Sequence, residues 1–192
     1  MLSTFQQPNF VLRRQVLALT GKFRIYAPDG RLAFYSQQKM FRLKEDIRVY
    51  TDESMQQEVL YIQARQIIDF AAAYDVIDST SRELVGTWRR KGLRSMVRDE
   101  WELLDRSGRP AGTLQEDNMT MALLRRFIFG KWMPQNYDVL MQNRRVADLR
   151  QRFNLLRYEL DLDFSMDQQG LFDHRLGIAG AILLATIEGR QE

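Results

Sequence analysis

The chain repeats a short phrase in which an aromatic residue precedes an acidic residue and a run of apolar residues. Copies occur at residues 74–78, 101–105 and 137–141, and each is followed by a polar turn and a second apolar run. Residues 23–30 supply another copy, which ends in the turn Pro28-Asp29-Gly30. Paired apolar runs joined by Asp, Gly, Asn or Ser residues are typical of β-hairpins. The sequence therefore predicts one hairpin unit that recurs along the chain.

These hairpins cover most of the sequence. Their strands are expected at residues 23–26 with 32–35, 46–50 with 59–62, 73–77 with 84–88, 100–104 with 111–114, and 137–141 with 146–149. An opening strand at residues 10–19 and a closing strand near residues 153–160 bring the count to about twelve. Because we find no linker rich in Pro, Ser or Gly, we expect one domain over residues 1–192, with its strands at about residues 10–164.

So many short antiparallel strands indicate a sandwich or a barrel, and closure into a barrel removes the exposed strand edges. Twelve strands enclose more space than wall side chains can fill, since about eight strands already give an interior that is just filled. Residues 176–187 form an apolar segment that is too short to span a bilayer and has the length of a buried core helix. We therefore predict a mainly β fold, a closed antiparallel barrel of about twelve strands around a buried C-terminal helix at about residues 173–188.

Composition limits the function. The chain has 28 Lys and Arg against 25 Asp and Glu, so its net charge is only +3, which permits acidic partners without requiring them. It has no cysteine, which excludes a disulfide framework, a thiol nucleophile and a thiolate metal site. The first residues lack the charged and apolar segments of a cleaved secretion signal. We therefore expect a cytoplasmic location.

Three stretches resemble the tubby-like superfamily, and specifically its LURP-one-related and phospholipid-scramblase-like members. They are residues 10–30, the phrase at 74–78, and the ending at 158–164 that leads into 173–177. The ending is the most specific, because scramblases have a similar Leu-Asp-Leu-Asp strand end before an apolar helix. The resemblance runs from about residue 10 to residue 187. It implies a twelve-stranded barrel around a central helix, and an association with phosphoinositide headgroups or with calcium-dependent lipid movement. Unlike scramblases, the chain lacks a proline-rich N-terminal region and an acylated cysteine cluster.

Two stretches, residues 88–98 and 125–132, combine basic with aromatic or apolar residues. Guanidinium forks bind phosphate oxygens, and an indole such as that of Trp88 favours a membrane interface. The candidate headgroup-binding residues are Arg89, Arg90, Lys91, Arg94, Arg98, Arg125, Arg126 and Lys131. The alternative is that both stretches are ordinary solvated hairpin ends, in which arginines pair with Asp99, Glu100 or Glu102. Nucleic acid is a less favoured partner, because the chain has none of the usual recognition motifs.

An acidic set, Asp161, Asp163 and Asp167, makes calcium a weak candidate ligand, because carboxylate oxygens suit this cation. The spacing does not fit the EF-hand loop, since Phe172 stands at the twelfth position where that loop has Glu. The alternative is that these carboxylates cap and solvate the connection between the last strand and the helix. We expect no other metal and no cofactor.

His174 is the only histidine, so any catalytic triad or imidazole metal site would depend on it. It lies between Asp173 and Arg175 at the start of the predicted helix. Asp173 is better interpreted as a helix cap, with His174 packing or hydrogen bonding nearby. The chain has no nucleophile elbow, zinc-binding helix or nucleotide-binding loop. We therefore predict a non-enzymatic protein.

The favoured function is peripheral binding of anionic phospholipids of the phosphoinositide type. Two alternatives stay open: a soluble protein-interaction scaffold with no lipid role, and a calcium-dependent, scramblase-like activity. The expected partners are therefore anionic membrane lipids or a protein, without a transmembrane segment in the chain.

Overall fold

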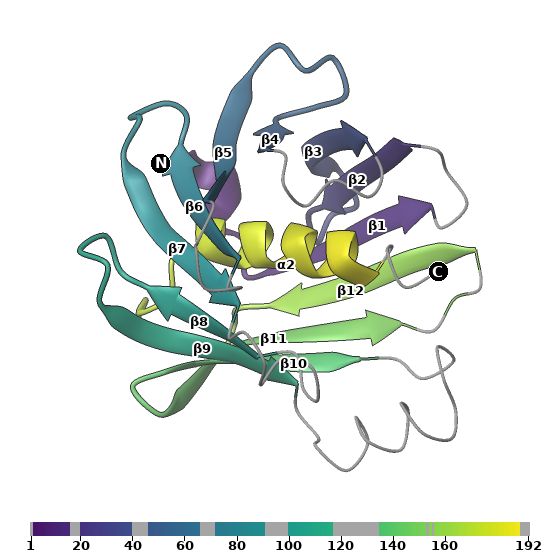
Figure 1. Cartoon of the computed structure of the whole chain (residues 1–192). Helices are drawn as coiled ribbons and strands as arrows, with labels where there is room; N and C mark the ends of the chain where they lie inside the picture. Colours follow the sequence, from purple (N-terminus) through teal and green to yellow (C-terminus); the bar gives the residue numbers. More distant parts are fainter. Residues whose placement is uncertain are drawn as a thin grey trace.

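Twelve antiparallel strands form a closed barrel around one helix in the computed structural model (Figure 1). The structure describes residues 2–15, 20–39, 46–65, 72–90, 100–116, 135–152, 154 and 156–188. The strands are β1 (Asn9–Gln15), β2 (Thr20–Tyr26), β3 (Leu32–Lys39), β4 (Ile47–Tyr50), β5 (Glu58–Arg65), β6 (Ala73–Asp78), β7 (Leu84–Arg90), β8 (Glu100–Leu104), β9 (Pro110–Glu116), β10 (Asn136–Met141), β11 (Arg144–Arg152) and β12 (Arg157–Asp163). A 3-10 helix, η1 (Ser3–Gln6), precedes β1, and α2 (His174–Glu188) follows β12. The predicted barrel around a C-terminal helix is confirmed.

The five hairpins are built in the same way. Each has a register shift close to its turn, at Ile25/Tyr26, Val49/Tyr50, Val76/Ile77, Leu103/Leu104 and Val139/Leu140. Such bulges increase the local twist of a strand pair. Gly30 and Gly108 adopt φ values of +79° and +76° in their turns, a conformation that glycine accepts without strain. The repeated phrase in the sequence therefore corresponds to a repeated hairpin in the structure.

The barrel has two distinct ends, because odd-numbered strands all run one way and even-numbered strands the other. One end carries the five hairpin turns and the start of α2, and we call it the turn end. The opposite end, where β1, β3, β5, β7, β9 and β11 finish and where α2 ends, is the far end. Contacts at the two ends of the helix confirm this direction: Arg175 reaches Asp78 at the turn end, and Gln38 reaches Thr186 near the far end.

The helix α2 fills the barrel and is enclosed on every side. Its residues 175–186 are all buried, as expected for a helix that is apolar around its whole circumference. Two glycines let it approach the wall closely. A Cβ atom at Gly177 would lie 2.5 Å from two ring carbons of Phe164, and at Gly180 it would lie 3.3 Å from Nε1 of Trp88. The Trp88 indole donates a hydrogen bond to the carbonyl oxygen of Leu176 at 2.9 Å.

A buried ion-pair network fixes α2 to the turn end. Arg175 is 8% exposed and donates through Nη1 to Oδ2 of Asp78, which is 5% exposed, at 2.5 Å. The same guanidinium donates through Nε and Nη2 to the carboxylate of Asp173. Asp78 also accepts the backbone N–H groups of Thr80 and Ser81 in the turn between β6 and β7. One arginine thus connects the helix start to a turn almost a hundred residues earlier.

The N-terminal 3-10 helix closes the turn end with an aromatic side chain. Phe5 is 1% exposed, and its ring stacks on that of Phe34 with the centroids 4.3 Å apart. Its carbonyl oxygen lies 2.7 Å from Nδ1 of His174, which must donate because a carbonyl only accepts. The His174 ring also stacks on Phe164. The sole histidine therefore holds η1 against the barrel, and the prediction that it packs or hydrogen bonds near the helix start is confirmed.

The closing strand differs in position from its sequence prediction, whereas the opening strand agrees with it as far as it is described. The opening strand is described as Asn9–Gln15, and residues 16–19 of the prediction lie outside the described residues. The closing strand starts at Arg157, about four residues later than expected. The Asn154 side chain accepts the backbone N–H groups of Leu156 and Arg157. This local turn competes with strand pairing and delays the start of β12.

The ladder between β3 and β4 is the shortest in the described barrel. These strands share two register pairs, Tyr35 with Tyr50 and Ser36 with Val49, whereas β5 and β6 share six. The Ser36 hydroxyl donates to the carbonyl oxygen of Arg48 at 2.8 Å, next to the point where the pairing stops. The barrel wall is therefore least strongly paired between β3 and β4.

We expect backbone amides of β4 to exchange with deuterium about fivefold faster than those of β6, because a missing ladder hydrogen bond is worth about 1 kcal/mol. Hydrogen-exchange mass spectrometry or NMR would measure the two strands in the same sample. Equal protection of β4 and β6 would contradict this prediction.

The part of the chain that the structure describes contains no helix long and apolar enough to cross a bilayer. The helix α2 has 15 residues.

Candidate functional site

The strand ends that flank the two predicted basic stretches lie together at the far end. Strand β7 ends at Arg90 and β8 begins at Glu100, whereas β9 ends at Glu116 and β10 begins at Asn136. The four strands are consecutive in the barrel, and β8 is paired with both β7 and β9. The topology therefore brings the borders of both stretches to one region of the far end.

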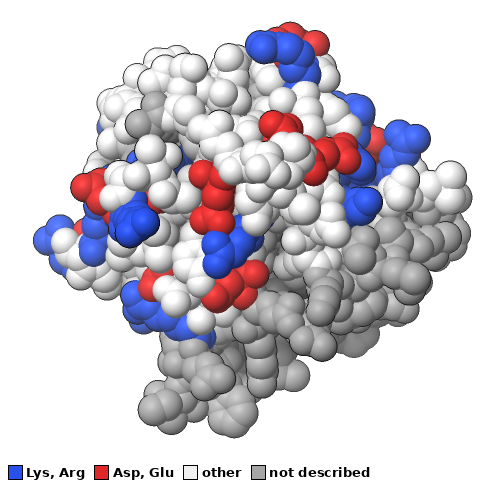
Figure 2. Space-filling model, turned by 90° about the horizontal axis from the view of Figure 1, so that it is seen from above, with Lys and Arg blue, Asp and Glu red and all other residues white. Residues whose placement is uncertain are grey.

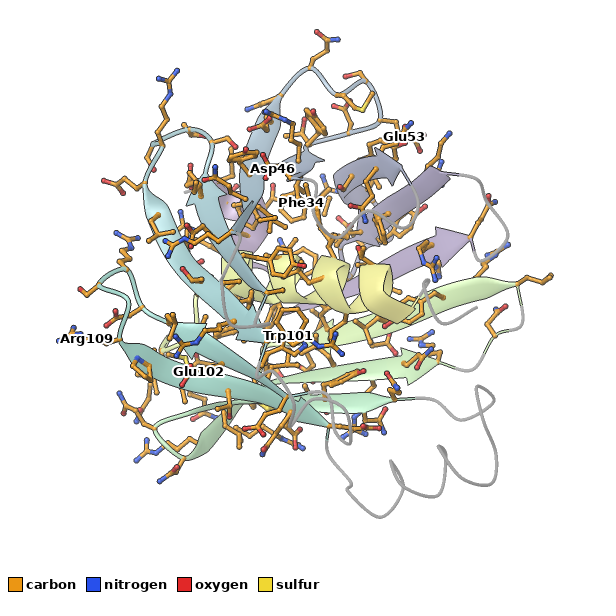
Figure 3. All side chains as sticks on the ribbon, in the orientation of Figure 1. Phe34, Asp46, Glu53, Trp101, Glu102 and Arg109 are labelled. Atoms are coloured by element: carbon orange, nitrogen blue, oxygen red, sulfur yellow. The ribbon has the colours of Figure 1, made fainter. Side chains whose placement is uncertain are left out.

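Two of the eight candidate headgroup residues lie within described strands. Arg89 is on the outer wall and forms an ion pair with Glu102, with its Nε donating to Oε2 at 2.9 Å. This is the pairing that the alternative interpretation expected. Arg90 is opposite Trp101 in the ladder, and Trp101 is buried, so strand alternation directs Arg90 toward the interior. In Figure 3, Trp101 lies next to α2 and Glu102 lies farther from it.

The other six candidates lie outside the described residues. They are Lys91, Arg94, Arg98, Arg125, Arg126 and Lys131. Their role in headgroup binding stays a prediction.

Trp88 does not supply an indole at a surface. It is 1% exposed, and its ring faces the helix rather than solvent. The sequence did not predict this orientation. Val85, Gly86, Thr87 and Trp88 are all buried in the structure, so this strand does not alternate between buried and exposed residues in the way that would indicate which face Trp88 occupies.

Ion pairs are frequent on the described outer wall, and most of them join neighbouring strands. Figure 2 shows Lys and Arg side chains interleaved with Asp and Glu over the described part of one face. Some arginines both form an ion pair with a carboxylate and lie over a tyrosine ring. Arg24 pairs with Glu53 through two hydrogen bonds and lies over Tyr35, and Arg48 pairs with Glu58 and lies over Tyr61. The Arg24 guanidinium also holds the pKa of Glu53 below its ordinary value.

The three carboxylates of the weak calcium candidate have separate roles. Asp161 accepts Nε of Arg152 at 2.6 Å, Asp163 accepts the backbone N–H of Ser165, and Asp167 accepts that of Phe172. Within the described ranges, no group of three or more Asp, Glu or His side chains is arranged to hold a metal ion. Asp163 and Asp167 thus cap the connection, as the alternative interpretation expected, whereas Asp161 instead pairs with Arg152 across two strands. Calcium binding stays a prediction.

At the helix start, Asp173 accepts the backbone N–H of Arg175 at 3.0 Å. A carboxylate in this position satisfies one of the free N–H groups of a helix and favours its positive end. The predicted cap is therefore confirmed. Sequence reasoning did not find the partner of Arg175, because Asp78 lies in another hairpin and nothing local connects the two residues.

A family model described as LURP-one-related matches residues 32–185. The chain belongs to the LURP-one-related family. The X-ray structure of a protein from Arabidopsis thaliana is similar to this LURP-one-related barrel with a TM-score of 0.50 and 15% sequence identity, over 93% of this chain and 90% of that chain. At this identity the likeness shows the fold alone. No curated protein matches the chain significantly.

Proposed function

We propose that this LURP-one-related protein is a non-enzymatic module that binds anionic phospholipids of the phosphoinositide type at a cytoplasmic membrane surface. One observation carries the proposal: the strand ends that flank residues 91–99 and 117–135 are neighbours at the far end of the barrel. A membrane-binding surface needs cations for the phosphates and apolar side chains for the interface.

The sequences between these strand ends have both properties. Residues 91–98 contain three Lys or Arg residues together with Leu93, Met96 and Val97. Residues 125–132 contain three more, with Phe127, Phe129 and other apolar side chains. At the same end, Leu156 is 68% exposed. Basic and apolar residues in one region suit a charged, amphipathic surface better than they suit solvent alone.

The contacts of Arg89 determine which variants should test the proposal. Removing Arg89 would leave the carboxylate of Glu102 without its guanidinium, so lost binding could reflect a disturbed wall. A sharper variant changes Lys91, Arg94 and Arg98 to glutamine. The matched control changes Arg82, Arg106 and Arg144 to glutamine, which removes the same charge from the turn end.

We expect the first variant to lose at least tenfold in binding to phosphoinositide vesicles at low salt, because each Lys or Arg near an anionic membrane contributes about 1 kcal/mol. The control should bind almost as tightly as the unmodified protein. Vesicle co-sedimentation with phosphoinositide, phosphatidylserine and neutral lipids, with and without calcium, measures both. Equal losses in the two variants would argue against a site at the far end. Absence of binding to every vesicle would favour the protein-interaction scaffold, and dependence on calcium would favour the scramblase-like alternative.

A further inference from the structure

In most ion pairs of the outer wall, the arginine lies nearer the far end of the barrel than its acidic partner does. Among the described residues, six wall pairs join side chains at different levels of the barrel, and in five of them the arginine lies nearer the far end. The five are Arg24–Glu53, Arg48–Glu58, Arg65–Asp75, Arg150–Asp148 and Arg152–Asp161. The sixth, Arg145–Asp138, has the opposite direction.

The strand register establishes each displacement. Asp161 is opposite Arg150, so its partner Arg152 lies two residues closer to the far end. Asp75 is opposite Gln63, and its partner Arg65 is again two residues closer. Two residues of strand span about 6.6 Å. In each such pair the backbone of the arginine therefore lies two residues nearer the far end than that of the acid, while the paired atoms themselves lie 2.5 Å and 2.6 Å apart.

The helix dipole acts in the opposite direction. The helix α2 has 15 residues, so it extends about 22 Å and places roughly half a negative charge at the far end. On the outer wall, five of the displaced pairs have the arginine nearer the far end and one has it nearer the turn end. The described outer wall therefore has its positive side toward the far end.

The residues at the two ends follow the same polarity. The hairpin turns and the connection to α2 hold more acids than cations. The acids are Asp29, Asp52, Glu53, Glu83, Asp105, Asp167 and Asp173, and the cations are Arg31, Arg82, Arg106 and Arg109. At the far end, Lys22 and Arg157 lie near the beginnings of β2 and β12 with exposed side chains, and the acids at the same end include Asp46 before β4 and Glu100 at the start of β8.

We infer that the barrel binds an anionic bilayer end-on, with the far end toward the lipid, α2 close to the membrane normal and the turn end directed away. This inference rests on the proposed function and adds the orientation. An anionic surface attracts the positive side of the wall and repels the acidic turn end. The exposed Leu156 at the far end favours a bilayer over a nucleic acid, because a leucine gains from an acyl interface and gains little beside phosphates.

Single labelled cysteines test the orientation, since the chain has no cysteine of its own. Leu156→Cys places an environment-sensitive fluorophore at the far end, and Ser107→Cys places one in an exposed turn at the turn end. On vesicles of phosphatidylcholine with phosphatidylserine and phosphoinositide, the first label should become protected from aqueous iodide. The second should remain as accessible as in solution. Pure phosphatidylcholine vesicles are the control for both.

The outcomes separate the orientation from the function. Co-sedimentation of both labelled proteins, with protection of the turn-end label or equal protection of both, would overturn the end-on orientation and leave lipid binding intact. Failure of the unlabelled protein to sediment with any vesicle would overturn both proposals. Protection of the far-end label alone supports the orientation.

Charge exchange provides a second test that leaves the net charge unchanged. The double variant Arg152→Asp with Asp161→Arg reverses one displaced pair, and we expect vesicle binding at low salt to fall about threefold. The matched double variant Arg145→Asp with Asp138→Arg turns the one opposed pair into the common direction, so its binding should be equal or tighter. Thermal melts of both verify folding. Identical effects of the two exchanges would overturn the role of wall polarity.

Discussion

Replacing Arg175 by alanine is expected to lower the free energy of unfolding by about 3–5 kcal/mol, the usual cost of removing one partner from a buried ion pair. Asp78 and Asp173 would lose the guanidinium that neutralises them, and Asp78 is only 5% exposed. Urea unfolding followed by tryptophan fluorescence measures the loss, because Trp88 and Trp101 are both buried. The matched control is Arg109→Ala, which breaks the exposed pair with Asp105 and should cost about 0–1 kcal/mol.

The pH dependence of the difference in unfolding free energy between the wild type and Arg175→Ala identifies the cause of that difference. Burial alone would raise the pKa of Asp78, but the backbone N–H of Ser81 and the Arg175 guanidinium outweigh it and lower the pKa below its ordinary value. A lowered pKa contributes stability above the ordinary pKa of a carboxyl group, and this contribution is lost as the pH falls through the lowered value. The gap between wild type and Arg175→Ala should therefore be largest near neutral pH and shrink in acid. A gap that stays constant would assign the effect to packing instead.

Replacing Gly177 by alanine is expected to destabilise the barrel by about 2 kcal/mol or more, although alanine is the better helix former by about 1 kcal/mol. The added Cβ would lie 2.5 Å from two carbons of the Phe164 ring and 3.1 Å from the Phe172 ring. Both rings are buried, so they cannot move aside without disturbing the core.

Gly180→Ala is the matched control on the same helix. Its Cβ would lie 3.3 Å from Nε1 of Trp88, a distance that a small shift can accommodate. We expect its free energy of unfolding to change by less than about 1 kcal/mol, because the gain in helix propensity offsets the tighter contact. Thermal and urea unfolding compare the two variants directly. Equal destabilisation by both would show that the wall beside Gly180 cannot shift either, and no destabilisation by either would mean that the helix is loosely seated, contrary to its burial.

The sequence predicted the architecture because the determining signals are local. The turn at residues 28–30 and its counterpart at residues 105–109 place Asp and Gly where hairpins need them. The apolar segment at residues 176–187 was correctly assigned as a core helix from its length. The error at the closing strand also has a local cause, the short turn in which the Asn154 side chain accepts the backbone N–H of Leu156, which the sequence analysis did not predict.

The candidate site was less predictable, because its chemistry depends on register and on which face a residue occupies. Arg89 and Arg90 are adjacent in the sequence, yet one pairs with Glu102 on the outer wall and the other is opposite the buried Trp101. A bulge at Val76/Ile77 shifts the register between β6 and β7, so the faces of their residues do not follow from simple alternation along the strand. A single sequence does not reveal this bulge. The axial displacement of the wall pairs likewise follows only from strand register, such as that between β5 and β6 and between β11 and β12.

The position of α2 after all twelve strands affects how the protein must fold. Strand β1 closes the barrel by pairing with β12, about 150 residues later, and the helix that fills the interior is synthesised after both. A ribosome therefore releases the whole wall before the core that stabilises it exists. Contacts of such high sequence separation fold slowly, and the incomplete wall exposes apolar faces to other chains meanwhile. Chaperone demand in the cell should consequently be set by the interval between synthesis of the first strand and docking of the last helix.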